Sequence, residues 1–298
     1  MHVIEGTMQI HGLGFLVAAA LATAIPLAHA ETMRLLTNQG EREAIVLPWR
    51  QGPAPTIIVL HGQTSTAAWT AENSGFGDTA AAHRFTAVFP QGIRKQWNDG
   101  REARAADIDD VGFLHRLVTA LVGRGMADPK QIYLAGISNG GMMTFRMLCE
   151  ASELFAGAAT VIANMPARIG ERCAPRKPVP VVMFNGTNDP LVPYDGGGVG
   201  FLGGRGSVWA TEETAEFMAD VNACAAARAL PLPSSWRGRV QATRIEWTYC
   251  RSGSPVALYR FDGGGHQVPG QRSFLPFFLG RGTRALNAAD EAFAFFRR

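Results

Sequence analysis

The sequence predicts an α/β fold in which a mostly parallel central sheet is flanked by helices. Residues Thr56–Leu60 form a continuous apolar run, which is typical of a strand buried on both faces of a parallel sheet. Apolar residues between Ile108 and Leu121 fall at helical spacing and predict a crossover helix. Further apolar runs and helical patterns alternate along the chain, and this alternation favours right-handed connections within one sheet.

The expected elements run from an opening hairpin to a terminal helix. Two short strands flank the turn Asn38-Gln39-Gly40 and predict the hairpin. The two strands of the hairpin are expected at residues 33–36 and 44–47. Further strands are expected at residues 56–60, 85–89, 132–134, 158–162, 179–184 and 256–261. Helices are expected directly after residue 138 and over residues 108–121, 208–218 and 286–296. The short connection between Ile162 and Val179 leaves no room for a large lid.

Residues 1–30 are expected to be a signal peptide. Leu13–Leu27 is apolar, and Ala28-His29-Ala30 matches an A-x-A cleavage site. A membrane anchor is the alternative, but the apolar run contains Pro26 and is short for a span. We therefore expect a secreted protein, periplasmic or extracellular, with no stable membrane span after cleavage. Residues 31–298 are expected to form a single domain.

Length and composition narrow the class of protein. A chain of 298 residues is long enough to bury one large core. The content of 47% hydrophobic and 18% charged residues is ordinary for a globular protein. A net charge of +3, without a run of Lys or Arg, gives no sign of a nucleic-acid-binding surface.

The four cysteines are Cys149, Cys173, Cys224 and Cys250. None forms a C-x-x-C pair, which argues against a zinc site or thioredoxin-type chemistry. An even number of cysteines in an exported chain favours disulfides. Three pairings are possible, and closure of the shortest loops favours Cys149–Cys173 with Cys224–Cys250. Free buried thiols are the alternative.

The sequence Gly136-Ile-Ser138-Asn-Gly140 is a G-x-S-x-G motif between an expected strand and an expected helix. A sharp strand-to-helix turn of this kind strains the serine backbone and exposes its Oγ. Gly136 and Gly140 lack the Cβ atoms that would collide across such a turn. An ordinary Gly-rich turn is the alternative. In this context we expect Ser138 to be a nucleophile.

A serine nucleophile needs a base within hydrogen-bond reach, and elimination among the histidines leaves His266. His83 and His115 are placed in helices, and His61 is better suited to shaping the turn after Thr56–Leu60. His266 follows the last expected strand in a Gly-rich loop, C-terminal to every candidate acid.

The expected acid is Asp189, which comes shortly after the strand ending at Phe184. Its role would be to orient the imidazole and stabilise its charged form. Asp195 and Asp262 are the competing candidates. The order Ser, Asp, His along the chain is the one found in the α/β-hydrolase fold, which we therefore expect here.

Two backbone N–H groups are expected to form an oxyanion hole. One belongs to Asn139, directly after the nucleophile, and the other to Gln63 in the loop after Thr56–Leu60, with Thr64 as the alternative. No metal and no cofactor are expected. Residues Gly198–Gly203 match G-x-G-x-x-G, but the motif does not follow a strand and lies far from the first βα unit, so we reject a dinucleotide site.

Six motifs in order resemble the secreted polyhydroxybutyrate depolymerase and feruloyl esterase group of α/β-hydrolases, from about residue 33 to the C-terminus. They are Leu60-His-Gly, Trp97-Asn-Asp99, Asp110-Val-Gly-Phe113, Gly136-Ile-Ser-Asn-Gly-Gly-Met-Met143, Gly186-Thr-Asn-Asp-Pro-Leu-Val-Pro-Tyr194 and Gly264-Gly-His266. The resemblance implies Ser138, Asp189 and His266 as a triad and paired cysteines. One departure concerns substrate preference: the group commonly has His-Thr-Trp-Pro-Gly, whereas this chain has His266-Gln-Val-Pro-Gly270.

The expected function is that of a serine carboxylesterase that works through an acyl-enzyme on an ester substrate, which can be polymeric. Polyhydroxybutyrate-type polyester or its oligomers compete with feruloylated or acetylated plant polysaccharide as substrate. A serine peptidase and a non-catalytic binding protein are the alternatives from other classes. Trp97, Phe277 and Phe278 are expected to contact the substrate, although the two phenylalanines could instead close the core.

Overall fold

The structure is a computed structural model that describes residues 30–49, 52–101, 107–232 and 240–298. The expected signal peptide therefore lies outside the described residues, apart from Ala30. Within the described ranges, none of the helices combines the length and the apolar character that crossing a membrane requires.

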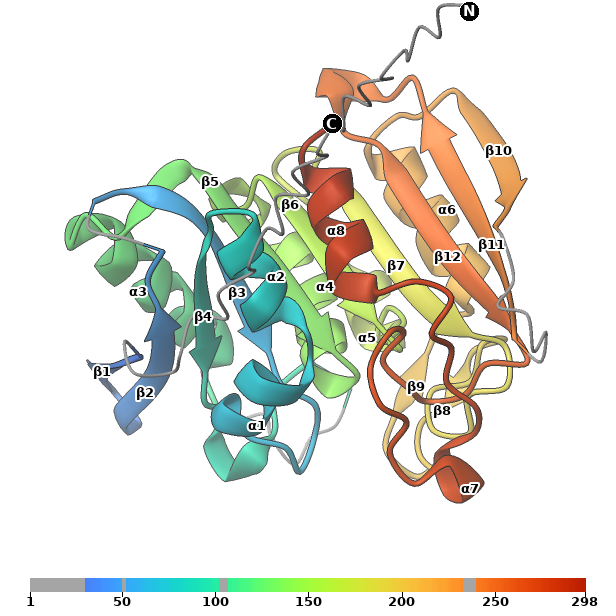
Figure 1. The fold of residues 1–298 in the computed structure, drawn as a ribbon, viewed down its shortest axis with the longest axis horizontal. Coiled ribbons are helices and arrows are strands. Elements are labelled where there is room, and N and C mark those ends of the chain that lie inside the picture. Colours follow the sequence, from blue (N-terminus) through green and yellow to red (C-terminus); the bar gives the residue numbers. More distant parts are fainter. Residues whose placement is uncertain (1–29, 50–51, 102–106, 233–239) are drawn as a thin grey trace, which may run out of the picture.

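Strands from both halves of the chain form one sheet, in the order β1-β2-β4-β3-β5-β6-β7-β12-β11-β10 (Figure 1). Their bounds are Glu31–Thr37 (β1), Gly40–Leu47 (β2), Ala54–Leu60 (β3), Thr86–Pro90 (β4), Ala127–Ile137 (β5), Gly157–Val161 (β6), Val181–Gly186 (β7), Ala226–Pro231 (β10), Gln241–Thr248 (β11) and Val256–Asp262 (β12). The block from β4 to β12 is parallel, and the strands beyond it at either edge are antiparallel. The prediction of a mostly parallel sheet is confirmed.

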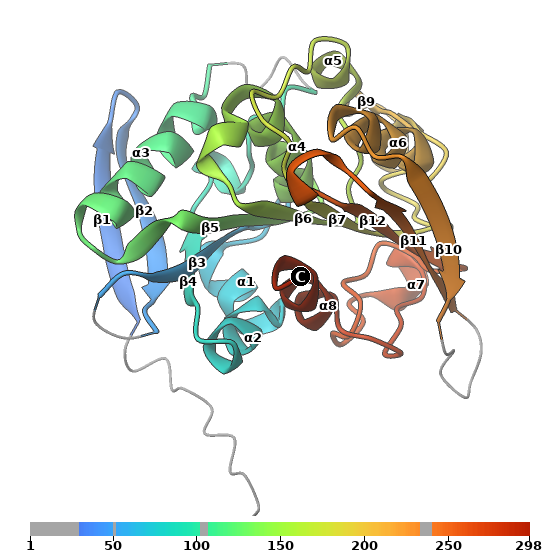
Figure 2. The ribbon, with the colours of Figure 1, turned by 90° about the horizontal axis from the view of Figure 1, so that it is seen from above.

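Helices cover both faces of the sheet. Their bounds are Ala67–Asn73 (α1), Phe76–Ala82 (α2), Asp110–Gly123 (α3), Asn139–Ala151 (α4), Ala167–Gly170 (α5), Thr211–Val221 (α6), Pro276–Leu279 (α7) and Ala288–Phe296 (α8). Single 3₁₀ turns lie at Ile93–Lys95, Ser152–Leu154 and Arg251–Gly253, and a small hairpin joins β8 (Gly197–Gly198) to β9 (Ser207–Val208). Figure 2 shows α3, α4 and α6 on one face and α1, α2 and α8 on the other, so the molecule has three layers.

The two faces of the sheet explain why its central strands are mostly apolar. Side chains alternate along a strand, so neighbours point to opposite faces. In β3, Ile58 and Leu60 belong to one buried cluster, whereas Ile57 and Val59 belong to the other. Both clusters are covered by helices, and apolar residues on both faces of the strand are therefore favoured.

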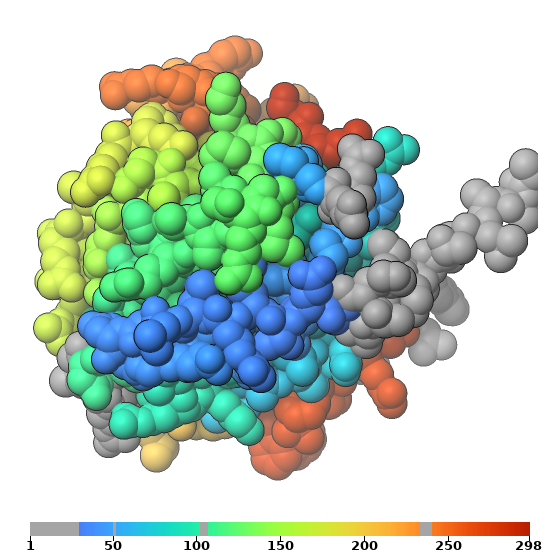
Figure 3. All heavy atoms as spheres, turned by 90° about the vertical axis from the view of Figure 1, so that its left-hand side faces the viewer, coloured from blue at the N-terminus to red at the C-terminus, as the bar shows by residue number. Residues whose placement is uncertain are grey.

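The first hairpin shows the contrasting pattern of a sheet edge. Buried and exposed residues alternate in β2, and exposed charged residues such as Arg34 and Glu41 lie along the pair. The hairpin runs across the outer surface at one end of the molecule (Figure 3). Charged side chains at such an edge discourage pairing with another chain.

Strands β10 and β11 were not expected from the sequence. Residues 226–231 read Ala-Ala-Arg-Ala-Leu-Pro and are mostly exposed, so neither apolar character nor β-branched residues mark them as a strand. The segment is extended because it pairs with β11, which pairs in turn with β12. Tertiary pairing overrides local preference at this edge.

Several expected boundaries also need correction. The helix expected from Val208 begins at Thr211, because Val208 pairs in β9. A helix was expected to end at His83, and His83 is indeed the C-cap of α2, whereas α1 was not expected. Residues 267–283 were not expected to contain a helix, yet Pro276 starts the single turn of α7. Proline fits the first helical position because a backbone N–H at that position would have no acceptor within the helix.

Both expected disulfides are present, and no cysteine among the described residues is free. Cys149–Cys173 ties the end of α4 to the segment after α5. Cys224–Cys250 lies beside the pairing of Ala226 with Thr248 and fixes the junction of α6, β10 and β11.

Replacing both Cys224 and Cys250 by serine should lower the free energy of unfolding by about 3 kcal/mol, because the bridge restricts the unfolded chain. The two residues are 26 positions apart. Urea unfolding followed by circular dichroism, without reductant, measures the difference from the unmodified protein. An unchanged unfolding free energy would contradict the expected stabilisation, and free thiols in a non-reduced digest would contradict the pairing itself.

Candidate active site

Ser138 lies at the turn between β5 and α4 with φ 54° and ψ −119°. Residues other than glycine rarely adopt this backbone conformation, which costs about 1–3 kcal/mol and persists only where the surroundings enforce it. Here the Ser138 N–H donates to the carbonyl of Val161 at 2.8 Å. The strained turn predicted from the G-x-S-x-G motif is confirmed.

The two glycines of the motif allow the close packing around this turn. A Cβ atom at Gly136 would lie 2.2 Å from the carbonyl oxygen of Gly140. A Cβ atom at Gly140 would lie 2.4 Å from the carbonyl oxygen of Leu60, at the end of β3. Both distances are well below contact, so any larger residue would push α4 away from the sheet.

His266 and Asp189 complete a chain of hydrogen bonds that starts at Ser138. His266 Nε2 lies 3.0 Å from Ser138 Oγ, and His266 Nδ1 lies 2.7 Å from Asp189 Oδ2. Asp189 Oδ1 accepts from the N–H groups of Leu191 and Val192, both at 2.8 Å. These donors hold the carboxylate in place, so that it can fix the imidazole with its proton on Nδ1 and leave Nε2 to accept from the serine.

The competing acids do not reach the histidine. Asp262 pairs with Arg260 at 3.1 Å, and Asp195 is an exposed residue of the next loop. The alternative histidine, His61, is fully buried. Its Nδ1 donates to the carbonyl of Gly62 at 2.8 Å, and its Nε2 accepts from the N–H of Gly92 at 2.9 Å. Burial lowers the pKa of His61 and keeps it neutral, consistent with a role in shaping the turn.

The expected oxyanion donors lie next to the serine. Among the described residues, the backbone N–H groups of Asn139 and Gln63 donate to no other protein group. A Cβ atom on Gly62 would lie 3.6 Å from Ser138 Cβ, which brings the loop holding Gln63 against the nucleophile. The N–H of Thr64, the alternative donor, is used by the carbonyl of Lys95 at 2.8 Å. The free N–H of Gln63 fits the role better.

Side chains around Asn139 anchor the start of α4. Its Oδ1 accepts from the Trp97 N–H at 2.8 Å, and its Nδ2 donates to Asp99 Oδ2 at 2.6 Å. Asp99 forms a buried ion pair with Arg101 at 2.8 Å. Asp110 accepts from the N–H of Asn98 at 2.6 Å, so the motifs around residues 97–99 and 110–113 meet behind the nucleophile. Sequence reasoning found both motifs but not their shared task.

The expectation that Trp97 contacts substrate finds no support. The side chain is 2% exposed, and its Nε1 donates to the carbonyl of His61 at 2.9 Å. The ring packs beside His61, with centroids 5.0 Å apart. Trp97 therefore holds the loop after β3 against α4 from the inside.

The two phenylalanines expected to contact substrate are on the surface. Phe277 is 91% and Phe278 61% exposed, which excludes the alternative that they close the core. They lie in α7, which sits beyond the ends of the parallel strands on the side where β7 also ends (Figure 1). The carbonyl of Leu279, at the end of α7, accepts from the His266 N–H at 2.7 Å, so this segment adjoins the candidate site.

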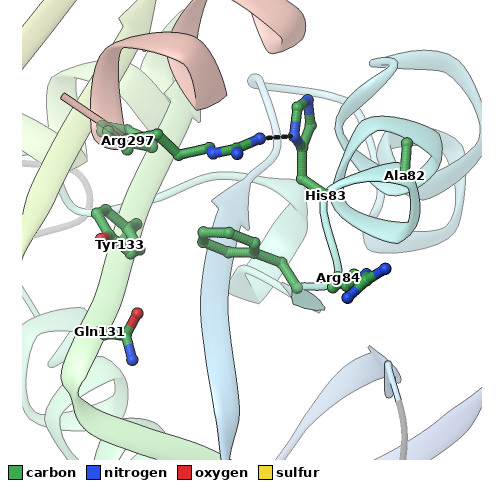
Figure 4. Close-up of a pocket in the computed structure, with 8 residues that line it drawn as sticks. Ala82, His83, Arg84, Gln131, Tyr133 and Arg297 are labelled. Atoms are coloured by element: carbon green, nitrogen blue, oxygen red, sulfur yellow. Dashed lines mark hydrogen bonds between the residues drawn. The ribbon is translucent and has the colours of Figure 1, made fainter.

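A depression of about 540 Å³ lies elsewhere, between the end of α2, the first part of β5 and the end of α8 (Figure 4). His83 and Arg297 contact each other there at 3.0 Å. None of its lining residues belongs to the candidate site, and Ser138 lies at the opposite end of β5. No group of side chains in the described ranges could hold a metal ion.

Comparison with known proteins finds similarity to esterases and depolymerases. Residues 95–168 match the Prolyl oligopeptidase family. The putative esterase NocK of Nocardia uniformis subsp. tsuyamanensis is 29% identical over 253 residues, which cover 81% of this chain and 73% of that protein. Feruloyl esterase B of Piromyces equi is 27% identical over 72% of this chain, and poly(3-hydroxyalkanoate) depolymerase C of Paucimonas lemoignei 26% over 49%. The chain spans only 39% and 38% of these two relatives.

A solved structure supports the fold. The acetyl xylan esterase from Aspergillus awamori aligns with a TM-score of 0.54 and 14% identity, covering 79% of this chain and 94% of that one. The chain has the fold of the α/β-hydrolases, and its relatives are esterases and depolymerases, which indicates an enzyme of the serine esterase class. It is similar to feruloyl esterases and polyhydroxyalkanoate depolymerases, as its motifs predicted.

The substitution Ser138→Ala should lower kcat for 4-nitrophenyl acetate by about 10⁴-fold or more, because no other group can take the acyl chain. The melting temperature should stay within a few degrees of the original, since the hydroxyl packs against little. Ser207→Ala, at an exposed position of β9, is the control and should keep full activity. Turnover by a pure Ser138→Ala sample close to that of the control would refute the assignment.

Proposed function

We propose that the chain is a secreted carboxylic-ester hydrolase with Ser138, His266 and Asp189 as its triad, acting on polyhydroxybutyrate-type polyester or its oligomers. The observation that carries the proposal is the continuous hydrogen-bonded chain from Ser138 Oγ through His266 to Asp189, at 3.0 and 2.7 Å. This geometry suits proton transfer from the serine hydroxyl to Nε2 without rearrangement.

In the proposed cycle, His266 removes the proton from Ser138 as Oγ attacks the ester carbonyl carbon. The N–H groups of Asn139 and Gln63 stabilise the negative charge on the carbonyl oxygen. Collapse of the tetrahedral intermediate releases the alcohol, which takes the proton from His266, and leaves an acyl-serine. Water, deprotonated by His266, then attacks the acyl carbon. Collapse releases the carboxylic acid, and His266 returns the proton to Ser138 Oγ. Asp189 keeps the imidazole oriented and offsets its positive charge at each step.

Two observations support a large or polymeric ester. The connection between β6 and β7 contains only the single turn of α5, so no long insertion covers the site from there. Exposed aromatic side chains lie on α7 beside His266, and an apolar polymer chain can contact them. Poly(3-hydroxyalkanoate) depolymerase C is among the relatives, although the match covers about half of this chain.

A feruloyl or acetylxylan esterase is the second candidate. Feruloyl esterase B matches 72% of the chain, a longer stretch than the 49% matched by the depolymerase. Both candidates use the same triad and differ only in the ester that is bound. The match to the Prolyl oligopeptidase family covers residues 95–168, which include Ser138 but neither Asp189 nor His266, so it gives no particular support to a peptidase.

Secretion is proposed from the expected signal peptide and from the two disulfides, which persist in oxidising compartments. On this view, residues 31–298 are the mature catalytic domain. A non-catalytic binding protein would have no reason to retain the assembled serine, histidine and aspartate.

A panel of esters tests the proposed substrate. Polyhydroxybutyrate film and 3-hydroxybutyrate trimer should be hydrolysed, with at least about tenfold higher kcat/KM for the trimer than for methyl ferulate or acetylated xylobiose. Released acids are measured by chromatography, with the Ser138→Ala protein as the blank. Preference for methyl ferulate or the acetylated sugar would replace the polyester proposal by the second candidate.

Exchanging both Phe277 and Phe278 for serine should selectively weaken the hydrolysis of long-chain and polymeric esters. Because both rings are exposed, the unfolding free energy should change by less than about 1 kcal/mol. Turnover of 4-nitrophenyl acetate should stay within twofold while that of polyester film falls by about tenfold. A parallel loss on both substrates would show that the rings do not contact the acyl chain.

A further inference from the structure

The segment from Phe274 to Gly280 leaves the loop of the catalytic histidine and returns to it. Where it returns, the N–H of His266 donates to the Leu279 carbonyl at 2.7 Å, and the N–H of Gly265 donates to the Arg281 carbonyl at 2.8 Å. A Cβ atom at Gly265 would lie 2.2 Å from the Leu279 oxygen, so the backbone at Gly265 and the backbone at Leu279 are as close as only glycine allows. The position of the segment is thus coupled to the backbone of His266.

The side chain of Gln267 joins the two ends of this segment. Its Nε2 donates to the Phe274 carbonyl at 2.7 Å and to the Gly280 carbonyl at 3.1 Å, and its Oε1 accepts from the Phe274 N–H at 2.9 Å. The residue is only 6% exposed. A buried amide whose donors and acceptor are all used on one segment fixes that segment strongly, because breaking any of these bonds leaves a buried polar group unpaired.

Apart from Gln267, backbone contacts hold the C-terminal end of the segment and the turn of α7, and the apolar side chains add little. Leu275 has φ 41°, a left-handed conformation that costs energy for a side chain other than glycine. The apolar side chains of the segment face solvent rather than a core, and Phe277 and Phe278 contact each other edge to face. Segments with so few buried contacts open easily unless polar contacts retain them.

Apolar exposure is concentrated around the candidate site. Nine large apolar side chains are markedly exposed in the described residues, and six of them lie on two loops. Four are in the segment itself, namely Phe274, Leu275, Phe277 and Phe278, and two, Phe201 and Leu202, are in the loop between β8 and β9. That second loop reaches the predicted oxyanion loop, because Arg205 Nη1 donates to Gln63 Oε1 at 3.2 Å.

The two loops approach the site from opposite sides. Figure 2 shows α7 on the face that carries α8, and β9 on the face that carries α6, while both lie beyond the carboxyl ends of the strands in Figure 1. An extended aliphatic acyl chain or a polyester strand entering the site would have apolar side chains on either side.

We propose that Gln267 is a positioning residue that sets substrate preference. It fixes the segment 274–280 against His266. The exposed apolar side chains of this segment, called here the aromatic ridge, are thereby preformed for an aliphatic acyl chain or polyester strand. A preformed ridge binds without first losing conformational freedom, whereas a loose one loses part of the contact energy to ordering. This inference rests on the proposed esterase function and extends it to the acyl chain. It also gives a physical role to a residue at which the chain departs from the motif of the group it resembles.

Gln267→Met tests the proposal, because it keeps the length of the side chain and removes all three hydrogen bonds. The probes are 4-nitrophenyl octanoate and 4-nitrophenyl acetate, which share a leaving group and differ only in the acyl chain. We expect kcat/KM for the octanoate to fall by about tenfold, mainly through KM, and that for the acetate to change by less than twofold. Gln131→Met, at an exposed position on β5 far from Ser138, is the matched control and should change neither.

Limited proteolysis reports on the segment itself. Chymotrypsin cleaves after Phe and Leu, and cleavage between residues 274 and 279 should become about tenfold faster in Gln267→Met but not in Gln131→Met. If Gln267→Met does not fold, Gln267→Glu replaces it: the carboxylate keeps the bond from the Phe274 N–H and loses the two donated bonds. The same shift in selectivity is expected from it.

The outcomes separate this inference from the function on which it rests. An unmodified protein without activity on 4-nitrophenyl acetate would refute the esterase function. The role of Gln267 alone would be refuted if the unmodified protein is active and Gln267→Met leaves the ratio of kcat/KM for octanoate to that for acetate unchanged. An equal fall in kcat/KM on both esters is one such result.

Discussion

The strained turn at Ser138 is the constraint on which the rest of the candidate site depends. Its backbone conformation is held because β3, β5 and α4 meet there with glycine at each point of closest approach. The same packing brings the loop after β3 beside the serine and leaves the first N–H of α4 without a protein acceptor in the described part of the chain. One feature of the backbone therefore places both the candidate nucleophile and the proposed oxyanion donors, and no side chain has to move to assemble them.

Around this rigid centre, the site is completed by loops that follow other strands. Asp189 and His266 follow β7 and β12, which are neighbours in the sheet, so their loops leave the same edge side by side. Parallel strands deliver residues far apart in sequence to one place in this way. The parts differ in their freedom to vary: the centre is locked by steric contact, whereas the loop after His266 is held by polar contacts of a few side chains.

Elements of the fold could be predicted from the sequence where a local pattern of residues determines them, and could not where a distant contact does. The central strands were predictable because both of their faces are buried, which leaves an unbroken apolar run such as Thr56–Leu60. The hydrogen-bonded contacts of Ser138, Asp189 and His266 agree with the expected order, while their catalytic roles stay predictions. Strand β10 could not be found, because pairing alone keeps its alanine-rich chain extended. The use of Gln267 depends on a carbonyl thirteen residues away, at Gly280, and no local pattern signals that contact.

The buried imidazole of His61 makes part of the stability of the fold depend on pH. Its Nε2 must stay unprotonated to accept from Gly92, and burial lowers its pKa below the usual 6.5. At this residue the unfolded chain therefore binds a proton more readily than the folded one. The contribution of His61 to stability is complete above pH 6.5 and declines as the pH falls below that value. Protonation of Nε2 would break the bond from Gly92, and the segment after Gly92 is tied through the Lys95 carbonyl to the N–H of Thr64, beside Gln63. One pH-sensitive contribution to stability is therefore located beside the loop that carries a proposed oxyanion donor, at a histidine outside the proposed triad.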